Sequence, residues 1–356
     1  MHQVTDSGKE TADAVGVVVI GRNEGERLER CLKSLADQRI ERLVYVDSGS
    51  TDGSVAFAKS IGFEVHELDL SKPFTMPRGR NEGFSRLIEL YPGLHYVQFV
   101  DGDCEVETGW IARAAGALDE HSSVAAVSGR RRELFPEASI YNYLAEVEWD
   151  RPLGEVKSTG GDVMMRVEVF AEVGGFDPSL IAGEEAELFI RIRALGWKVL
   201  QLSDPMTKHD SAITRFSQWW KRSKRTGHAY AEGMAMHGFG PERHEVRPVL
   251  RFMFWAGVMP VMLLLGLVMS LVAGGYWWVL VVGLLLAHLL AYVRIVMAFR
   301  HRLGRRSWLY AYFLMLGKYP ELLGGMTYLL NRLRGRRTGL IEYDRPVAVS
   351  RLGGEG

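Results

Sequence analysis

The chain has 356 residues, of which 47% are hydrophobic and 24% charged, and this composition is typical of a folded protein rather than a disordered one. Its net charge of zero combines an acidic part, residues 1–210, with a basic part, residues 211–356, which holds 20 Lys and Arg against 7 Asp and Glu. The acidic part argues against nucleic acid as a partner, because binding a phosphate backbone requires a basic face. Cys31 and Cys104 are too few for a disulfide framework, so we expect both to be reduced thiols.

Residues 1–14 are polar and lack the apolar run of a secretory signal, so we expect a polar N-terminal tail that does not direct export. Residues 15–210 then alternate short apolar runs with helical patterns. Runs rich in Val, Ile and aromatic residues predict strands at residues 15–20, 43–46, 63–68, 96–100 and 124–127. This alternation predicts an α/β fold with a mostly parallel sheet and helices on both faces, in which ligands bind beyond the carboxyl ends of the strands.

Polar residues follow the first two predicted strands. The first strand leads into Gly21-Arg22-Asn23-Glu24, and the second into Asp47-Ser48-Gly49-Ser50-Thr51-Asp52. Ser50 or Thr51 could cap the next helix, which explains the small polar residues but not Asp47. Farther on, Arg78 and Arg80 precede another helical run. An arginine near bound phosphates offers charge-assisted, bidentate hydrogen bonds, and a solvated surface arginine is the alternative.

The sequence Asp101-Gly102-Asp103 follows the fourth predicted strand and is the sharpest chemical signal in the chain. Within a strand the two carboxylates would point to opposite faces, but a turn at Gly102 lets both serve one site. Hard oxygen ligands at a strand end suit Mg²⁺ or Mn²⁺ bound together with a phosphate. An isolated Asp-Gly-Asp is more often a surface turn, and the polar ends of the other strands favour the metal site here.

Two features near residue 210 allow more than one interpretation. His209 follows a strand-like run and is either a structural histidine or a metal ligand. Trp219 and Trp220 could stack on a bound ligand or belong to an aromatic belt at a membrane surface.

Two apolar stretches, Phe252 to Ala273 and Tyr276 to Phe299, each reach the roughly 20 residues that cross a bilayer as a helix. Gly274-Gly275 joins them, so both outer ends lie on the same side of the membrane. Basic clusters flank the pair and predict that this side is cytoplasmic; their members are Lys221, Arg222, Lys224 and Arg225 before it and Arg300, Arg302, Arg305 and Arg306 after it.

A third apolar stretch, residues 308–330, contains Lys318, Pro320 and Glu321, and we interpret it as a re-entrant or interfacial segment, with a third true span as the alternative. The expected organisation is then a folded domain at residues 15–230, a linker at 231–250, a membrane region at 251–335 and a basic cytoplasmic tail at 336–356.

The order and spacing of the motifs over roughly residues 15–230 resemble the family 2 inverting glycosyltransferases with a GT-A fold. The motifs that carry the resemblance are Val18-Val19-Ile20 leading to Asn23-Glu24, Val46-Asp47-Ser48-Gly49-Ser50-Thr51-Asp52, Arg80-Asn81-Glu82-Gly83, Asp101-Gly102-Asp103, Gly160-Gly161-Asp162, Gly174-Gly175-Phe176-Asp177 and Gly183-Glu184-Glu185.

The resemblance implies roles for individual residues. The end of the first strand and Asp47 would hold the nucleotide base, Arg80 the nucleotide, and Asp103 the metal, Mn²⁺ or Mg²⁺. Asp101 would lie on the ribose or metal side, and His209 would complete metal binding. The donor-binding set comprises Ile20, Arg22, Glu24, Asp47, Arg80, Asp101 and Gly161.

The family's catalytic base is usually an Asp in a Glu-Asp pair that opens a helix. Here the pair is Glu184-Glu185, so Glu185 takes the base position with one extra methylene. A positioned carboxylate can accept the proton of an attacking hydroxyl. Glu184, Trp219 and Trp220 are candidates for the acceptor side.

The resulting hypothesis is an inverting transferase that moves a sugar from a nucleotide-diphosphate donor to a hydroxyl of a lipid-linked or cell-envelope saccharide by metal-assisted direct displacement. It would be a multi-pass protein of the bacterial inner membrane with its catalytic domain in the cytoplasm. Two alternatives remain open: synthesis of a polyprenyl-phosphate sugar, which needs no base, and a non-catalytic membrane-associated nucleotide-sugar-binding or scaffold protein.

Overall fold

The computed structural model describes residues 14–336 and 339, which form two compact units divided between Arg215 and Phe216. The first unit ends before the expected limit at residue 230 because helix α9 (Phe216–His237) packs on α14 (Lys318–Leu333) within the second unit. The expected terminal tails, residues 1–14 and 336–356, lie outside the described residues apart from Ala14, Arg336 and Gly339.

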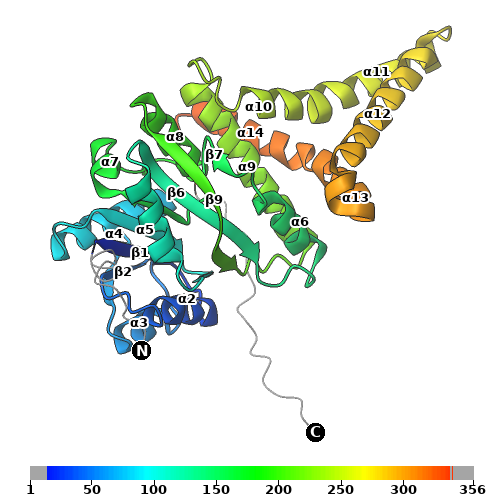
Figure 1. The fold of residues 1–356 in the computed structure, drawn as a ribbon. Helices are drawn as coiled ribbons and strands as arrows, with labels where there is room; N and C mark the ends of the chain where they lie inside the picture. The colour runs from blue at the N-terminus through cyan, green and yellow to red at the C-terminus, as the bar shows by residue number, and fades with distance from the viewer. Residues whose placement is uncertain (1–13, 337–338, 340–356) are drawn as a thin grey trace. The chain divides into compact units, whose positions relative to one another are not determined.

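The first unit is built on a nine-stranded sheet with the order β3-β2-β1-β4-β8-β6-β9-β5, and β7 pairs with β9 (Figure 1). The strands are β1 (Val15–Gly21), β2 (Leu43–Asp47), β3 (Glu64–Glu67), β4 (Tyr96–Asp101), β5 (Cys104–Val106), β6 (Val124–Glu133), β7 (Gly154–Glu155), β8 (Val163–Arg166) and β9 (Lys198–His209). Strands β1 to β4 are parallel, as expected. The sheet as a whole is mixed, because the short strand β8 inserts antiparallel between β4 and β6.

Helices cover both faces of this sheet, which confirms the expected α/β architecture. Alternate residues of β1 enter separate cores: Val17 and Val19 face one, and Val18 and Ile20 face the other. The first core is closed by α2 (Glu26–Ala36), α3 (Ser54–Ser60) and α5 (Trp110–Glu120), and the second by α4 (Met76–Leu90), α7 (Val167–Glu172) and α8 (Glu184–Ala194). Helix α6 (Ile140–Trp149) packs on β6.

The parallel register brings the polar strand ends together. Gly21 of β1 pairs with Asp47 of β2, and Ile20 pairs with Asp101 of β4 on the other side. Gly102 then turns the chain, donating its N–H to the carbonyl of Ile20 at 2.8 Å. A Cβ at Gly102 would lie 2.9 Å from that oxygen, so the close approach requires glycine.

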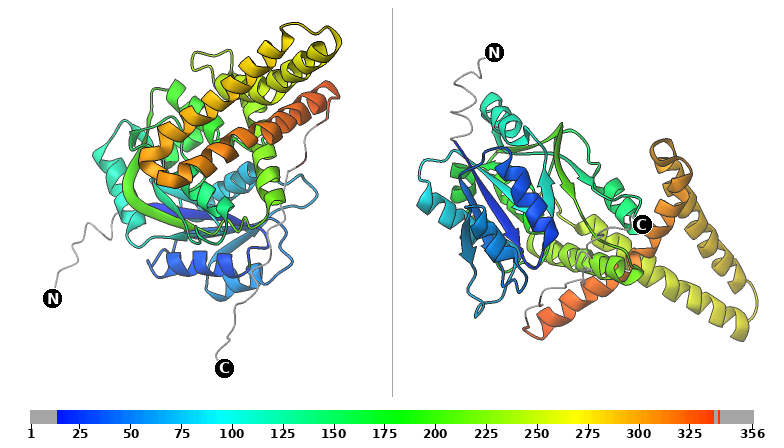
Figure 2. Two further views of the ribbon diagram at one scale, coloured as in Figure 1. Left: turned by 90° about the vertical axis from the view of Figure 1, so that its right-hand side faces the viewer. Right: turned by 90° about the horizontal axis from the view of Figure 1, so that it is seen from below.

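The second unit consists of helices: α9, α10 (Val246–Phe252), a π-helical turn (Met253–Val258), α11 (Met259–Val272), α12 (Trp277–Leu303), α13 (Ser307–Leu316) and α14. Much of the expected linker at residues 231–250 is helical, because α9 continues to His237 and α10 begins at Val246. Figure 2 shows α11 and α12 running side by side as a hairpin, whose turn uses positive φ at Gly274 and Gly275.

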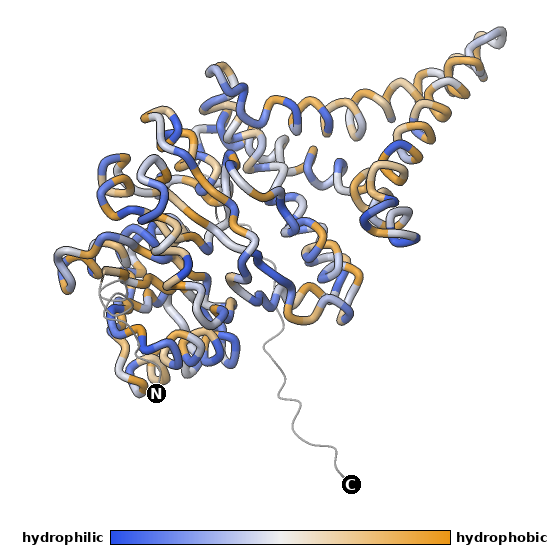
Figure 3. The backbone as a smooth tube through the Cα atoms, viewed as in Figure 1, coloured by the Kyte–Doolittle hydropathy of each residue, from blue (hydrophilic) through white to orange (hydrophobic). Residues whose placement is uncertain are grey.

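Two helical segments, Val246–Val272 and Trp277–Leu333, are long and apolar enough to cross a membrane. Figure 3 shows the hydrophobic residues that dominate α11 and α12. Their large apolar side chains are exposed, as at Leu271 and Leu290. Residues 308–330 form α13 and α14, and a re-entrant or interfacial placement of this segment stays a prediction.

Candidate active site

The carboxylate of Asp101 lies between two arginines at the end of β4. Its Oδ1 accepts a hydrogen bond from Arg80 Nη2 at 2.8 Å, and its Oδ2 accepts one from Arg131 Nη2 at 3.1 Å. Burial alone would raise the pKa of Asp101, but the two guanidinium groups outweigh it and lower the pKa below its ordinary value. Asp101 is therefore an ionised carboxylate held by cations from α4 and β6.

Arg80 connects Asp101 to the two glutamates that begin α8. Its Nη1 donates to Glu184 Oε1 at 2.9 Å and lies 3.8 Å from Glu185 Oε1. The side chain of Glu184 is 3% exposed and that of Glu185 is 21% exposed. Glu184 is thus enclosed with its arginine partner, whereas Glu185 can be reached from outside.

The environment of Glu185 raises the pKa of its carboxyl to about 7. Burial is the largest cause, the charge of Glu184 adds to it, and Arg80 opposes both. A carboxyl group that exchanges its proton near neutral pH is suited to act as a general base.

Gly161 lies against this pair. A Cβ at this position would come within 2.2 Å of Arg80 Nη2 and 3.1 Å of Glu185 Oε1. Gly161 therefore packs against Arg80 and Glu185 with no room for a side chain, and its role in donor binding stays a prediction.

Asp162 and Arg131 are central to the site, and our sequence analysis assigned neither of them a role. Asp162 is 1% exposed; it accepts hydrogen bonds from the backbone N–H of Asp101 at 2.9 Å and from Thr207 Oγ1 at 2.9 Å, and it pairs with Arg131 at 3.0 Å. The buried Asp162 carboxylate, just before β8, therefore connects Asp101 of β4, Arg131 of β6 and Thr207 of β9. The sequence offered two signals: Asp162 is the last residue of a Gly-Gly-Asp motif, and three consecutive arginines follow the apolar run at residues 124–127.

Asp103, the last residue of the Asp101–Gly102–Asp103 turn, lies close to His209 at the end of β9. His209 Nε2 is 3.3 Å from Asp103 Oδ2, and both side chains are buried. The pairing of β5 with β9 sets Cys104 opposite His209 and so fixes this juxtaposition. Burial lowers the pKa of His209, but the Asp103 carboxylate more than compensates and raises it to about 9.

These residues fit a divalent cation better than the second acidic cluster does. Asp101, Cys104 and Asp162 also lie together, but the Arg131 guanidinium already occupies that position, at 3.0 to 3.1 Å from each of them. Asp103 and His209 offer an oxygen and an imidazole nitrogen, donors that suit Mn²⁺ or Mg²⁺. Burial raises the pKa of the Cys104 thiol, so it stays protonated rather than acting as a thiolate ligand.

The expected nucleotide-side residues lie around the ends of β1 and β2. The buried Asp47 carboxylate accepts N–H groups of Gly49 at 2.9 Å and Ser50 at 2.8 Å, and it accepts the hydroxyl of Tyr45 at 2.9 Å. These contacts shape the turn after β2. Asp47 and Asp101 flank β1 from opposite sides, which places them at the same edge of the sheet.

The other expected residues of this edge differ in exposure. The Ile20 side chain belongs to the core, and its carbonyl receives the Gly102 N–H. Arg22 is exposed, and Glu24 pairs with Arg27 at 3.0 Å.

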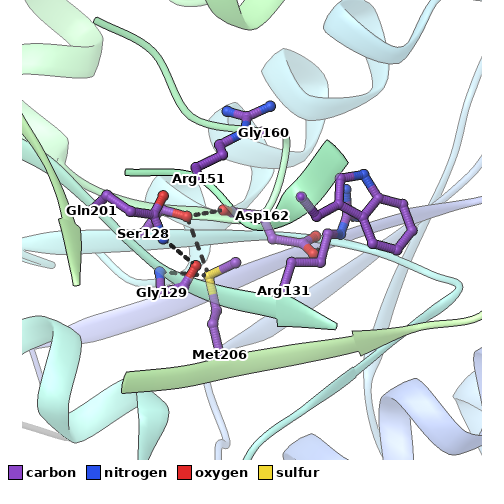
Figure 4. Close-up of a pocket in the computed structure, with 9 residues that line it drawn as sticks. Ser128, Gly129, Arg131, Arg151, Gly160, Asp162, Gln201 and Met206 are labelled. Atoms are coloured by element: carbon purple, nitrogen blue, oxygen red, sulfur yellow. Dashed lines mark hydrogen bonds and ion pairs between the residues drawn. The ribbon is translucent and has the colours of Figure 1, made fainter. Parts of the chain in front are cut away.

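A cavity of about 40 Å³ lies between β6, β9 and the residues just before β8, next to the Arg131 and Asp162 side chains that contact Asp101 (Figure 4). In Figure 4, Arg131 points toward Asp162 in its wall. The Arg131 guanidinium lies 5.2 Å from the ring centre of Trp149, whose indole also meets His209 edge-on at 4.7 Å. The cavity is lined by Ser128, Gly129, Arg131, Trp149, Arg151, Gly160, Asp162, Gln201 and Met206.

Trp219 and Trp220 lie in α9, in the second unit. Trp219 is buried in an aromatic cluster with Phe216, Trp220 and Phe313, and its ring meets that of Phe313 at 5.0 Å. Helix packing accounts for Trp219, and an acceptor-side role for either tryptophan remains a prediction.

Residues 16–170 match the family described as glycosyl transferase family 2. Together with the fold and the acidic strand ends, this match over residues 16–170 confirms the resemblance to family 2 glycosyltransferases that the motifs of this region showed. The chain is similar to Glycosyltransferase AglE of Haloferax volcanii, with 24% identity over 230 residues, covering 61% of this chain and 73% of that protein. It is also similar to Succinoglycan biosynthesis protein ExoA of Rhizobium meliloti, with 24% identity over 279 residues, covering 73% and 81%.

Among solved structures, the fold is similar to that of the mannosyltransferase PcManGT from Pyrobaculum calidifontis, crystallised in complex with GDP-Man and Mn²⁺. The TM-score is 0.55, the sequences are 16% identical, and the match covers 90% of this chain and 88% of PcManGT. At this level of identity the similarity shows a shared fold.

Proposed function

We propose that this glycosyltransferase is inverting and metal-dependent, and that it transfers a sugar from a nucleotide-diphosphate donor to a hydroxyl of a lipid-linked or cell-envelope saccharide. The observation that carries the proposal is the arrangement of Glu185, Arg80 and Asp101. An accessible carboxyl with a pKa of about 7 lies 3.8 Å from a buried guanidinium, which in turn binds the strand-end aspartate.

In the proposed reaction, Glu185 accepts the proton of the acceptor hydroxyl as its oxygen attacks the anomeric carbon. The new C–O bond forms while the bond from that carbon to the diphosphate oxygen breaks, and the nucleoside diphosphate departs. Attack from the side opposite the leaving group inverts the anomeric configuration. Arg80 lies 3.8 Å from Glu185, where its charge stabilises the diphosphate as it becomes more negative.

Asp103 and His209 would hold the divalent cation, with Asp101 on the donor side of the same turn. When bound, Mn²⁺ or Mg²⁺ supplies electrostatic stabilisation of the diphosphate oxygens. The Mn²⁺ and GDP-Man in the PcManGT crystal support this choice of cofactor and donor class.

The nucleotide would lie over the ends of β1 and β2, held by Ile20, Arg22, Glu24 and Asp47. Their position supports this assignment, because ligands of open α/β sheets bind outside the carboxyl ends of the strands. Gly161 leaves the room that the Arg80 guanidinium needs to lie beside Glu185, and so supports the position of Arg80 on the donor side.

We further propose that the enzyme is a multi-pass protein of the bacterial inner membrane with its catalytic domain in the cytoplasm. The two apolar helical segments and their exposed side chains support membrane insertion. The basic residues that flank the hairpin support the orientation, since such residues remain on the cytoplasmic side.

The proposal is tested by incubating the purified full-length protein, in detergent, with UDP-, GDP- and dTDP-sugars in Mn²⁺ or in EDTA. We expect one donor to raise the melting temperature and to release nucleoside diphosphate, and we expect EDTA to abolish the release and added Mn²⁺ to restore it. Absence of both binding and turnover with every donor would favour the non-catalytic scaffold.

One observation favours the second candidate function, synthesis of a polyprenyl-phosphate sugar. Two arginines, Arg131 and Arg151, line the cavity beside Asp101, and guanidinium groups suit a phosphate acceptor. A phosphate is already ionised and needs no base. The Glu185→Gln variant would then retain activity within about threefold with a polyprenyl phosphate, whereas the hydroxyl-acceptor reaction would lose it.

A further inference from the structure

Glu133, the last residue of β6, has a buried carboxylate that the proposed reaction does not use. Its side chain is fully buried. Oε1 accepts hydrogen bonds from Asn142 Nδ2 and from the backbone N–H of Phe135, both at 3.2 Å, and Oε2 accepts the N–H of Ser211 at 3.3 Å. These donors are neutral, so they solvate the carboxylate without cancelling its charge.

The imidazole of His209 lies between this carboxylate and that of Asp103. His209 pairs with Glu133 in the register of β6 and β9, and its carbonyl accepts the N–H of Leu134 at 2.8 Å. Its Nε2 is 3.3 Å from Asp103 Oδ2, and its Nδ1 is 4.0 Å from Glu133 Oε2. Nδ1 is buried and makes no hydrogen bond in the structure.

A neutral imidazole that binds a metal must offer a lone pair on one nitrogen and keep its proton on the other. A carboxylate on the far side stabilises that remaining N–H, which fixes the tautomer and the ring orientation. Here Glu133 lies on the Nδ1 side and Asp103 on the Nε2 side. The buried Glu133 carboxylate, whose hydrogen-bond donors are all neutral, is also stabilised by the positive charge of a metal ion bound to the other nitrogen of the His209 ring.

We propose that Glu133 is a positioning residue that holds His209 with its proton on Nδ1, so that Nε2 can bind a divalent cation together with Asp103. The inference rests on the metal dependence proposed above. It goes beyond that proposal by naming the group that prepares the imidazole.

Glu133 also supports the local fold through Asn142 and Ser211, so the test must separate positioning from structure. Glu133→Gln keeps an oxygen for the neutral donors but removes the charge facing Nδ1. Glu146→Gln is the matched control, because Glu146 accepts the backbone N–H of Glu133 at 2.7 Å and pairs with Arg132 without contacting His209.

The measurement is the Mn²⁺ dissociation constant of the full-length protein in detergent, obtained from the electron paramagnetic resonance signal of free Mn²⁺, so it does not depend on turnover. We expect Glu133→Gln to weaken Mn²⁺ binding about 10- to 100-fold, the range found for groups that orient a metal ligand. Glu146→Gln should stay within about twofold. In a His209→Gln background, Glu133→Gln should have no further effect, because its influence passes through the imidazole.

The inference is overturned if folded Glu133→Gln binds Mn²⁺ within twofold of the wild type, or if it weakens binding equally without His209. Should Glu133→Gln not fold, Glu133→Asp is measured in the same cycle, and a weakening that persists in the His209→Gln background likewise overturns the inference. Wild-type protein that binds Mn²⁺ no better than Asp103→Asn would instead contradict the proposed metal-dependent function itself, and the inference with it.

Discussion

Replacing Glu185 by Gln should remove the general base and, at alkaline pH, make the folded protein more stable. The ionised carboxylate of Glu185 is buried beside Glu184, which raises its pKa from 4.5 to about 7. Folding therefore favours the protonated form. The folded state binds more protons than the unfolded state between these two values, so the free energy of unfolding falls as the pH rises from about 4.5 to about 7.

The size of this effect follows from the pKa. A tenfold change in proton affinity corresponds to about 1.4 kcal/mol, so the charge of Glu185 lowers the free energy of unfolding by at most about 3 kcal/mol above pH 7. The 21% exposure of the side chain reduces this figure. Glutamine resembles the protonated carboxyl, so the variant should gain about 1–3 kcal/mol relative to the wild type at pH 8 and almost nothing at pH 4.

Activity should change in the opposite direction. Loss of a general base costs about 10²- to 10⁴-fold in turnover. The wild-type kcat/KM should rise with pH through an inflection near pH 7, as Glu185 loses its proton, and the variant should show no such inflection. The assays are nucleoside diphosphate release with a hydroxyl acceptor from pH 5 to 9 and thermal unfolding at pH 4 and pH 8.

Glu187→Gln is the control, because Glu187 lies in the same helix and pairs with Arg191 at 2.6 Å. It should lower stability and leave the pH profile of turnover unchanged. The reasoning about Glu185 is refuted if Glu185→Gln keeps a third or more of the wild-type turnover with a hydroxyl acceptor, or if it is less stable than the wild type at pH 8.

Three further outcomes test other parts of the structure. Asp103→Asn should weaken Mn²⁺ binding, measured by titration, by about tenfold or more, and an unchanged affinity would exclude Asp103 as a ligand. Gly161→Ala would place a Cβ 2.2 Å from Arg80 Nη2 and should lower turnover about 100-fold. Gly116→Ala is the control and should keep its turnover, because its Cβ would meet no atom within 4 Å. Equal turnover of the two variants would contradict the close packing at Gly161. Tyr276 lies at the turn of the hairpin, which the proposed orientation places outside the cytoplasm, and it is 85% exposed. Tyr276→Cys should therefore react with an impermeant maleimide added to intact cells, while the two natural cysteines, which are buried, should not. Reaction only after permeabilisation would show the opposite orientation.

The fold was largely predictable because its signals are local. Alternating apolar runs and helical periodicity indicated strands β1 to β4, and the polar residues after them indicated the edge at which Asp47 and Asp101 lie. The mixed character of the sheet was not predictable from these runs. Strand β8 has four residues, and its insertion between β4 and β6 depends on pairings with strands far away in the sequence.

The site was predicted in part, for the same reason. Asp101 and Asp103 were candidates because their residue types and spacing are visible along the chain, and Glu185 was a candidate because it matches the position of the base in the family that the motifs resemble. Arg131 and Asp162 were missed because their contacts with Asp101 span 30 and 61 residues and arise from the order of β4, β8 and β6.

The sequence by itself determined the strands β1 to β4, the acidic turn after β4, the glutamate pair that opens α8 and the two apolar segments, since each depends on residues that are neighbours in the chain. Only the tertiary structure decided what each carboxylate can do. Glu184 and Glu185 are adjacent in the chain, yet Arg80 encloses one and leaves the other reachable with its pKa raised to about 7. The physical reason is that the charge state of a buried group depends on its burial and on the charges within a few ångströms, which for Glu185 come from α8, α4 and β4.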